Sequence, residues 1–298
     1  MDQGIFFLIV LGSVWMIFAS IQDFKKREVA NWLNFSLIIF ALGARFFYSF
    51  FFNEGFGFFY QGVIGLGIFF VLGNLFYYMR VFAGGDAKLM IALGTILPFS
   101  NDFFINLKIY VLFLCIFFIT GSIYGLFFSL ILTFKNFNKF RKEFIVQFSS
   151  NKKIFYISYI FGLFILVMGF LEFFFVYFSL ILFFFPWLYT YAKAVEEGSM
   201  VYELKVSEIT EGDWLYKDLK IGRRIIKAKW DGLSKSEINF IRKKLKKVKI
   251  KKGIPFIPVF LISFIVLIWL YFYFPFENYG ILLGSHIFPL EFSIFSIF

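Results

Sequence analysis

The chain has 298 residues, of which 60% are hydrophobic and 25% aromatic, and its formal net charge is +11. A soluble domain carries roughly 45–50% apolar residues, so an ordinary soluble globular protein is excluded. The net charge could indicate a nucleic-acid binder, but the basic residues lie in short segments between long apolar runs. The single cysteine, Cys115, excludes an internal disulfide and a multi-cysteine zinc site.

Apolar runs of about 20 residues recur along the chain, and this is the length that a helix needs to cross a bilayer. We predict an all-α polytopic membrane helix bundle of about eight transmembrane helices. The fourth is short, the fifth is long, and the sixth and seventh form a tight hairpin around Glu172. The expected ranges are 4–21, 32–52, 57–79, 87–100, 106–134, 154–170, 172–191 and 254–275.

The basic residues predict the orientation of these helices. With the N-terminus outside, only Arg45 and Lys108 among the 30 Lys and Arg residues fall away from the inner side. The loops then expected inside are 22–31, 80–86, 135–153 and 192–253. We therefore expect a multi-pass plasma-membrane protein whose basic face contacts anionic inner-leaflet lipids, and no nucleic acid.

The loop before the last helix is long enough to form a small cytoplasmic α+β domain. Residues 200–209 alternate weakly, as a strand does, and residues 219–226 resemble a hairpin that turns at Gly222. Ser234 and Glu237 form a capping box, which begins a predicted basic amphipathic helix over about 235–247. We expect this domain to lie against the membrane.

Two aspartates stand out because each lies at the end of an apolar run. Asp23 follows the first run, and Asp86 precedes the fourth, directly after Gly84 and Gly85. In the orientation above both lie at the inner face. Two neighbouring carboxylates can share one proton, so that one takes a proton from water while the other hydrogen-bonds the attacked carbonyl. The glycines remove side-chain bulk beside the second acid.

Each aspartate also has an ordinary structural interpretation. Asp23 could be an interfacial acid beside Lys25 and Lys26, and Asp86 could be a simple helix-start residue. Their matching depth, together with the double glycine, favours a functional pair.

The two motifs resemble those of the type IV prepilin peptidase and archaeal preflagellin peptidase family of GxGD-type membrane aspartyl proteases. In the first motif, Asp23 precedes a basic segment that ends in Val29-Ala30-Asn31, where the family often has Ile-Pro-Asn. The second, Ala83-Gly84-Gly85-Asp86-Ala87-Lys88, resembles GxGDxK with alanine at the first glycine. The resemblance covers about residues 5–135. It implies that the catalytic residues are Asp23 and Asp86, and that the supporting residues are Gly84, Gly85, Lys88 and Asn31.

The resemblance implies an aspartic-type endopeptidase that cleaves the class III signal peptide of prepilin-like or preflagellin-like precursors at the cytoplasmic face. Its partners would be precursors with a basic leader followed by an apolar helix. Bacterial members often add a four-cysteine zinc segment and methylate the new N-terminus. Because only Cys115 is present, we expect no metal, no cofactor and no methyltransferase activity. The predicted domains are 1–135 (catalytic core), 136–192 (basic loop and hairpin), 193–253 (α+β) and 254–298 (last helix and external tail).

Three other functions stay open. A presenilin-type or signal-peptide-peptidase-type protease also uses a GxGD aspartate, but carries its first acid within a span. A transporter or channel would place more acids or broken helices at the midplane. An inactive assembly scaffold could keep both acids.

A few further residues carry weaker signals. Arg45 lies well inside the second predicted span, where a charge indicates function or a side chain that reaches the interface. Asn34 could hydrogen-bond near Asp23. The glycines of the third span favour close helix packing over a ligand site, and these are Gly62, Gly65 and Gly67. The lone His286, in the external tail, is assigned no function.

Overall fold

The computed structural model describes residues 3–52, 55–222, 224–230 and 232–273. The chain forms two compact units, one made of residues 1–124 and 255–298 and the other of residues 125–254. The predicted external tail with His286, and the last residues of the predicted span 254–275, lie outside the described residues. The division into four domains stays a prediction.

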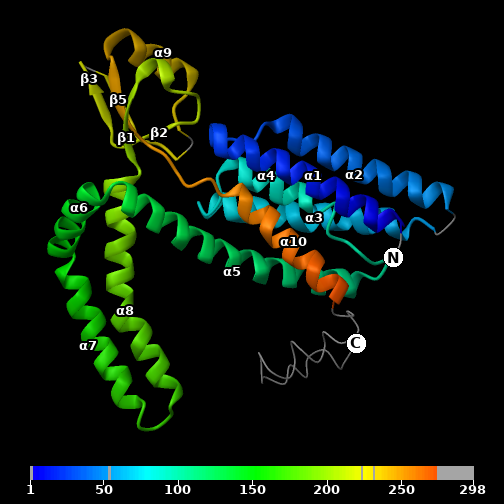
Figure 1. The fold of residues 1–298 in the computed structure, drawn as a ribbon, viewed down its shortest axis with the longest axis horizontal. Coiled ribbons are helices and arrows are strands. Elements are labelled where there is room, and N and C mark those ends of the chain that lie inside the picture. The colour runs from blue at the N-terminus through cyan, green and yellow to red at the C-terminus, as the bar shows by residue number, and fades with distance from the viewer. Residues whose placement is uncertain (1–2, 53–54, 223, 231, 274–298) are drawn as a thin grey trace. The chain divides into compact units, whose positions relative to one another are not determined.

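The first unit is a helix bundle, as the apolar runs predicted. Figure 1 shows α10 (orange) lying beside α1 (dark blue), although the two helices come from opposite ends of the chain. Apolar side chains from all its helices form one continuous core. Its helices are α1 (Gln3–Lys26), α2 (Asn31–Phe51), α3 (Gly57–Tyr78), α4 (Gly84–Leu93), the first part of α5 (Phe103–Lys135) and α10 (Ile257–Tyr273).

The predicted count of eight spans is not confirmed. Among the described residues, five helical stretches are long and apolar enough to cross a membrane, or six if one bent pair is a single span. The helix α4 has 10 residues and is about 15 Å long, so it cannot cross a hydrocarbon core of about 30 Å. The helix α10 is apolar, but with 17 residues it is too short to be counted among these five stretches. The five stretches are α1, α2, α3, α5 and residues 174–199.

Arg45 is fully buried inside the first unit, and it does not extend to an interface. Its guanidinium donates hydrogen bonds to the carbonyl oxygens of Thr95 (2.8 Å), Phe58 (2.9 Å), Ile96 (3.3 Å) and Pro98 (2.6 Å). Its central carbon also lies 4.3 Å from the centre of the Phe58 ring. Three of these carbonyls follow the end of α4. The side chain therefore supplies hydrogen-bond donors to the buried non-helical segment that follows α4.

Glycines bring α3 and α4 into close contact. A Cβ on Gly65 would collide with the carbonyl oxygen of Gly94, and one on Gly62 would collide with the side chain of Arg45. A Cβ on Gly73 would lie 2.8 Å from Ile91 Cγ1. The packing role predicted for Gly62 and Gly65 is confirmed. For Gly67 it is wrong, because a Cβ there would have no neighbour within 4 Å.

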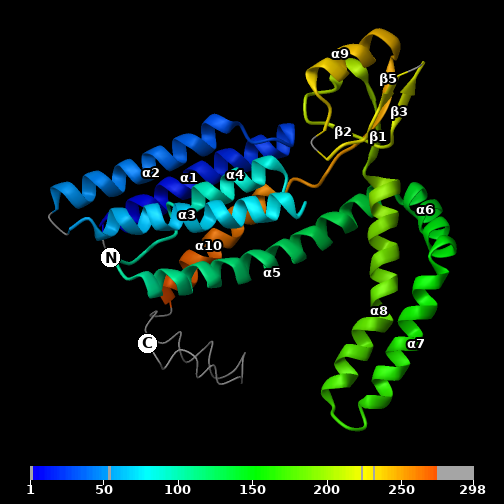
Figure 2. The ribbon, with the colours of Figure 1, turned by 180° about the vertical axis from the view of Figure 1, so that it is seen from behind.

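The second unit contains a helical hairpin, as predicted, and one helix where a loop was expected. Figure 2 shows α7 (Lys152–Met168) and α8 (Phe174–Ala194) side by side. The predicted loop 135–153 is mostly helical, because α6 (Phe137–Ser150) occupies it and is bent by 64° against α7. The helix α6 buries no residue, and its sequence mixes charged and aromatic side chains. A π-helical turn, η1 (Val195–Ser199), follows α8.

Between residues 201 and 251 the described residues form short strands and one helix, which agrees with the α+β content predicted there. Antiparallel strands form a sheet of order β1-β5-β2, which pairs Leu204 with Val248 and Leu215 with Ile250. The predicted turn at Gly222 joins β3 to β4, and its φ of 59° favours glycine. The strands are β1 (Val201–Lys205), β2 (Trp214–Leu215), β3 (Leu219–Ile221), β4 (Arg224–Ile226) and β5 (Lys247–Lys251), and a 3-10 turn, η2, covers Val206–Glu208.

The basic amphipathic helix ends earlier than predicted. The capping box at Ser234 and Glu237 is confirmed, but α9 (Lys235–Lys244) stops before Leu245, whose backbone is extended. The following residues alternate lysine with Val248 and Ile250, which are 4% and 0% exposed. This period of two is typical of a half-buried strand, and the strand β5 begins where the helix was predicted to end.

Replacing Arg45 by methionine should destabilise the protein by roughly 3–5 kcal/mol, because buried carbonyl oxygens lose their donor. Thermal unfolding in detergent measures the loss. Lys108→Met is the matched control, since Lys108 is the other basic residue away from the predicted inner side and is exposed. Equal melting temperatures for the two variants would contradict the role given to Arg45.

The packing of α3 on α4 predicts opposite effects for two neighbouring glycines. Gly65→Ala should cost about 1–3 kcal/mol, because the new methyl group collides with the backbone at Gly94. Gly67→Ala should be neutral or stabilise by about 0.5–1 kcal/mol, since alanine is the better helix former. The same melting assay compares them, and a Gly65→Ala variant as stable as Gly67→Ala would refute the contact.

Candidate active site

Asp23 lies in the last turn of α1 and is only 6% exposed. Its Oδ2 atom accepts a hydrogen bond from the backbone N–H of Ile257 at 3.0 Å, and the backbone amide of Phe256 also interacts with the carboxylate. Ile257 is the first residue of α10. The first N–H groups of a helix lack partners within the helix, so a buried carboxylate stabilises the start of α10.

Asp86 lies in the first turn of α4 and is partly exposed. Its Oδ2 atom accepts a hydrogen bond from the N–H of Ala83 at 3.1 Å, and Ala83 is the residue that precedes the helix. This contact is the half of a capping box in which an acid reaches back to the start of its own helix. The helix-start role weighed for Asp86 is therefore real.

The two carboxyl groups interact electrostatically. Burial raises the pKa of Asp86 to about 7, the hydrogen bond from Ala83 opposes this shift, and the negative charge of Asp23 raises the pKa further. The structure thus brings together the two acids that the sequence singled out. A carboxyl group with a raised pKa beside a second acid is a common arrangement at catalytic sites, although ion networks can also produce it.

The double glycine before Asp86 is not explained by packing within the chain. A Cβ on Gly84 would meet only Tyr77 Cε2, at 4.0 Å, and one on Gly85 would lie 3.6 Å from the nitrogen of Val29. Both are ordinary contacts, and neither glycine has a positive φ. An alanine would fit at either position. Among the described residues, the space next to Gly84 is therefore almost unoccupied, whereas Gly85 packs against Val29 at ordinary distances.

The two supporting polar residues contact each other. Lys88 Nζ donates a hydrogen bond to Asn31 Oδ1 at 2.7 Å, which joins the first turn of α4 to the first residue of α2. Asn34, one turn further along α2, is 1% exposed, and among the described residues its side-chain amide has no hydrogen-bond partner. The bond expected between Asn34 and the region of Asp23 is not seen.

Several neighbours of Asp23 escaped the sequence analysis. Arg27, whose φ is 58°, and Tyr124 on α5 both interact electrostatically with Asp23. Gln22 Oε1 accepts a hydrogen bond from the N–H of Ala30 at 3.1 Å and so closes the turn between α1 and α2. The sequence predicted α10 only as the apolar span 254–275. Nothing local indicates that the amide of Ile257 reaches Asp23.

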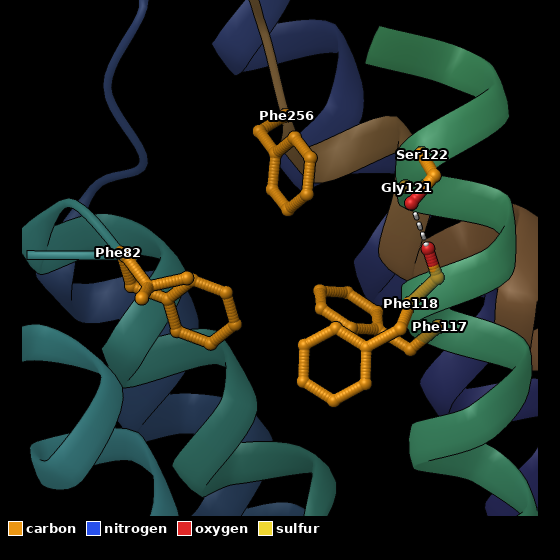
Figure 3. A pocket seen from close by; sticks show the side chains of 7 residues that line it. Phe82, Phe117, Phe118, Gly121, Ser122 and Phe256 are labelled. Carbon is orange, nitrogen blue, oxygen red and sulfur yellow. Dashed lines mark hydrogen bonds between the residues drawn. The ribbon is translucent and has the colours of Figure 1, made fainter. Parts of the chain in front are cut away.

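An apolar pocket of about 190 Å³ lies in the same unit. Figure 3 shows its aromatic rings turned toward one central space. The loop before α4, the helix α5 and the residue before α10 all contribute to it. Its lining residues are Val81, Phe82, Phe117, Phe118, Gly121, Ser122 and Phe256.

The described residues hold no group of three or more His, Cys, Asp or Glu side chains that could bind a metal ion. The expected lack of a metal and of a cofactor stays a prediction.

Comparisons with known proteins agree on one family. Residues 10–137 match the sequence profile of the type IV leader peptidase family. The chain is 29% identical over 155 residues to a preflagellin peptidase of Methanococcus maripaludis, covering 48% of this chain and 66% of that protein. It is 32% identical over 92 residues to a preflagellin peptidase of Methanocaldococcus jannaschii, covering 31% of this chain and 38% of that protein.

The match thus spans no more than 66% of either relative's length. No solved structure gives a significant match. The profile match includes both aspartates, both glycines, Asn31 and Lys88. Residues 10–137 are therefore similar to the type IV leader peptidase family, in agreement with the resemblance of the two aspartate motifs.

Proposed function

We propose that this chain is a membrane-embedded aspartyl endopeptidase that removes the leader peptide of prepilin-like or preflagellin-like precursors at the cytoplasmic membrane face. The observation that carries the proposal is the interaction between Asp23 and Asp86, in which Asp86 has a pKa of about 7. The family of residues 10–137 and the names of the two relatives support it.

The proposed mechanism divides the chemistry between the two acids. At neutral pH the two carboxyl groups share one proton. The raised pKa of Asp86 means that the proton is bound mainly to Asp86. Asp86 hydrogen-bonds the scissile carbonyl, and Asp23 takes a proton from the attacking water. The carbonyl carbon gains the hydroxyl group, the C–N bond breaks, and the leaving amine takes up the proton. The pair then returns to its starting state.

The open space beside Asp86 supports a role for the double glycine in substrate approach. A peptide bond must come within hydrogen-bond distance of both acids. A side chain at Gly84 would project into the space that the described residues leave unfilled, and one at Gly85 would lie against Val29. The bridge between Lys88 and Asn31 then holds the starts of α4 and α2 together while the substrate binds.

The proposed cytoplasmic site rests on the distribution of basic residues, which places the N-terminus outside. Asp23 and Asp86 then lie at the inner face, where a precursor's basic leader would meet its apolar helix. The position of Asp23 in the last turn of α1, rather than at its middle, favours cleavage at the membrane surface over cleavage inside a helix.

Asparagine variants separate catalysis from structural support. Asn keeps an oxygen that accepts the backbone N–H, but it cannot exchange a proton as a carboxyl group does. Asp23→Asn and Asp86→Asn should therefore preserve folding and lower processing at least about 100-fold. The assay co-expresses a tagged precursor, with a basic leader ending in glycine before an apolar helix, and scores its size shift on a gel.

Two controls make this assay decisive. Membrane levels are checked by blot, and Asp23→Ala is included because it also removes the acceptor for Ile257. We expect Asp23→Ala to lower the free energy of unfolding by about 1–2 kcal/mol and so to lower the melting temperature, whereas Asp23→Asn should leave both unchanged. If either Asn variant still processes the precursor, the proposed aspartyl mechanism is wrong, and a function as a transporter or an assembly scaffold is favoured.

The shared proton predicts the pH dependence of processing. A group with a raised pKa is protonated below that value, so Asp86 loses its proton as the pH rises through about 7. The processing rate should therefore fall across this range, because the scissile carbonyl loses its hydrogen-bond donor. Initial rates in proteoliposomes between pH 5.5 and 9 measure the effect, with melting temperatures taken in parallel. A rate that keeps rising to pH 9 would contradict the assignment of the proton to Asp86.

A further inference from the structure

The aromatic pocket is joined to both candidate acids through the backbone. Phe82 directly precedes Ala83, whose N–H hydrogen-bonds Asp86, and Phe256 directly precedes Ile257, whose N–H hydrogen-bonds Asp23. The rings of Phe82 and Phe256 lie 6.4 Å apart, measured between their centroids. The residues directly before the two hydrogen-bond donors therefore form two walls of the pocket.

The lining of the pocket suits an apolar group. The ring of Phe117 lies 5.7 Å from that of Phe82 and 5.8 Å from that of Phe256, and all three line the same space. The one hydroxyl group, on Ser122, donates its proton to the carbonyl oxygen of Phe118 at 2.8 Å (Figure 3). Its donor is thus already used within α5.

The size of the pocket corresponds to one side chain. An engineered cavity of about 150 Å³ lined by apolar residues binds benzene. The pocket here has about 190 Å³, which is enough for a phenyl ring or a branched aliphatic side chain but not for a helix. A peptide that is cleaved by the two acids would carry single apolar side chains of this size close to the pocket.

We propose that this pocket holds the first apolar side chain of the precursor after the cleaved bond, and so determines which precursors are processed. The assignment rests on the proposed function, because it requires a peptide whose apolar helix begins at the scissile bond. The leader side of that bond is basic and does not match an aromatic lining. Residues past the bond are apolar and do match it.

Gly121 provides a way to fill the pocket. Its Cβ would lie 3.2 Å from Phe256 Cζ and 3.6 Å from Phe256 Cε2, so a longer side chain would enter the space that the aromatic rings enclose. Gly125 follows one turn later on α5, and a Cβ there would have no neighbour within 4 Å. Gly121→Leu and Gly125→Leu therefore form a matched pair, with the same change on the same helix.

The test compares precursors that carry Phe or Ala immediately after the cleaved bond. The wild type should have a kcat/KM at least about tenfold higher for Phe, since burial of a phenyl ring is lost with Ala. Gly121→Leu should lower kcat/KM for the Phe precursor roughly tenfold and for the Ala precursor by less than about threefold, so the preference disappears. Gly125→Leu should keep the wild-type preference.

Phe118→Ala gives a second measurement that does not depend on the stability of the Gly121 variant. Phe118 is 48% exposed, and its truncation enlarges the pocket. This variant should process a Trp precursor better, relative to Phe, than the wild type does. A lipid acyl chain in the pocket would instead give losses that are the same for all precursors, and that result would overturn the assignment.

The possible failures are distinguishable. A wild type that processes the Phe and Ala precursors equally well would overturn the pocket assignment and leave the peptidase standing. Equal losses for both precursors in Gly121→Leu would do the same. A wild type that processes no precursor, or Asn variants that still process, would overturn the proposed function and the pocket assignment with it.

Discussion

The guanidinium of Arg45 supplies hydrogen bonds to four backbone carbonyls, three of which follow the end of α4. The segment that follows α4 is buried in the first unit, where a carbonyl group without a hydrogen-bond donor costs free energy. Arg45, on α2, supplies the donors. Gly65, on α3, packs so closely against Gly94 that a Cβ on Gly65 would collide with the carbonyl oxygen of Gly94, and this contact holds α3 on the same segment. With its far end fixed in this way, α4 presents its first turn, and hence Asp86, at a defined position.

Both candidate acids support the start of a helix. Asp23 accepts a hydrogen bond from the first N–H of α10, and Asp86 accepts one from the residue before α4. The N-terminal end of a helix carries a partial positive charge, so two such ends stabilise negative charge at the two acids. The structural roles and the proposed chemical roles thus fall on the same side chains. This overlap explains why each aspartate, considered alone, could be interpreted from the sequence as an ordinary residue.

The sequence was sufficient for features that depend on local pattern. Apolar runs of about 20 residues predicted α1, α2, α3 and α5, and the Ser234 capping box predicted the start of α9. It was insufficient where long-range contacts decide. The helix predicted over about 235–247 ends at Lys244, and the strand β5, which pairs with β1 through Val248 and Ile250, was not predicted.

The same limit applies to the candidate site. Motif spacing and family resemblance brought out Asp23 and Asp86, and Lys88 and Asn31 were included through the family alone. The contact between these last two side chains, the placement of Arg45 and the bond from Ile257 to Asp23 join residues far apart in the sequence. No local pattern encodes such distances. Only the packing of complete helices reveals them.

The bond between Asp23 and Ile257 spans 234 positions of the chain. A ribosome that adds about 5–20 residues per second needs roughly 10–50 s to deliver the second partner after the first. For most of that interval both aspartates have been synthesised, but the carboxylate of Asp23 lacks its α10 donors and Phe256 has not yet closed the aromatic pocket. The order of synthesis therefore keeps the site incomplete until α10 has been made. Assembly itself thus delays any peptide-cleaving activity in a nascent chain.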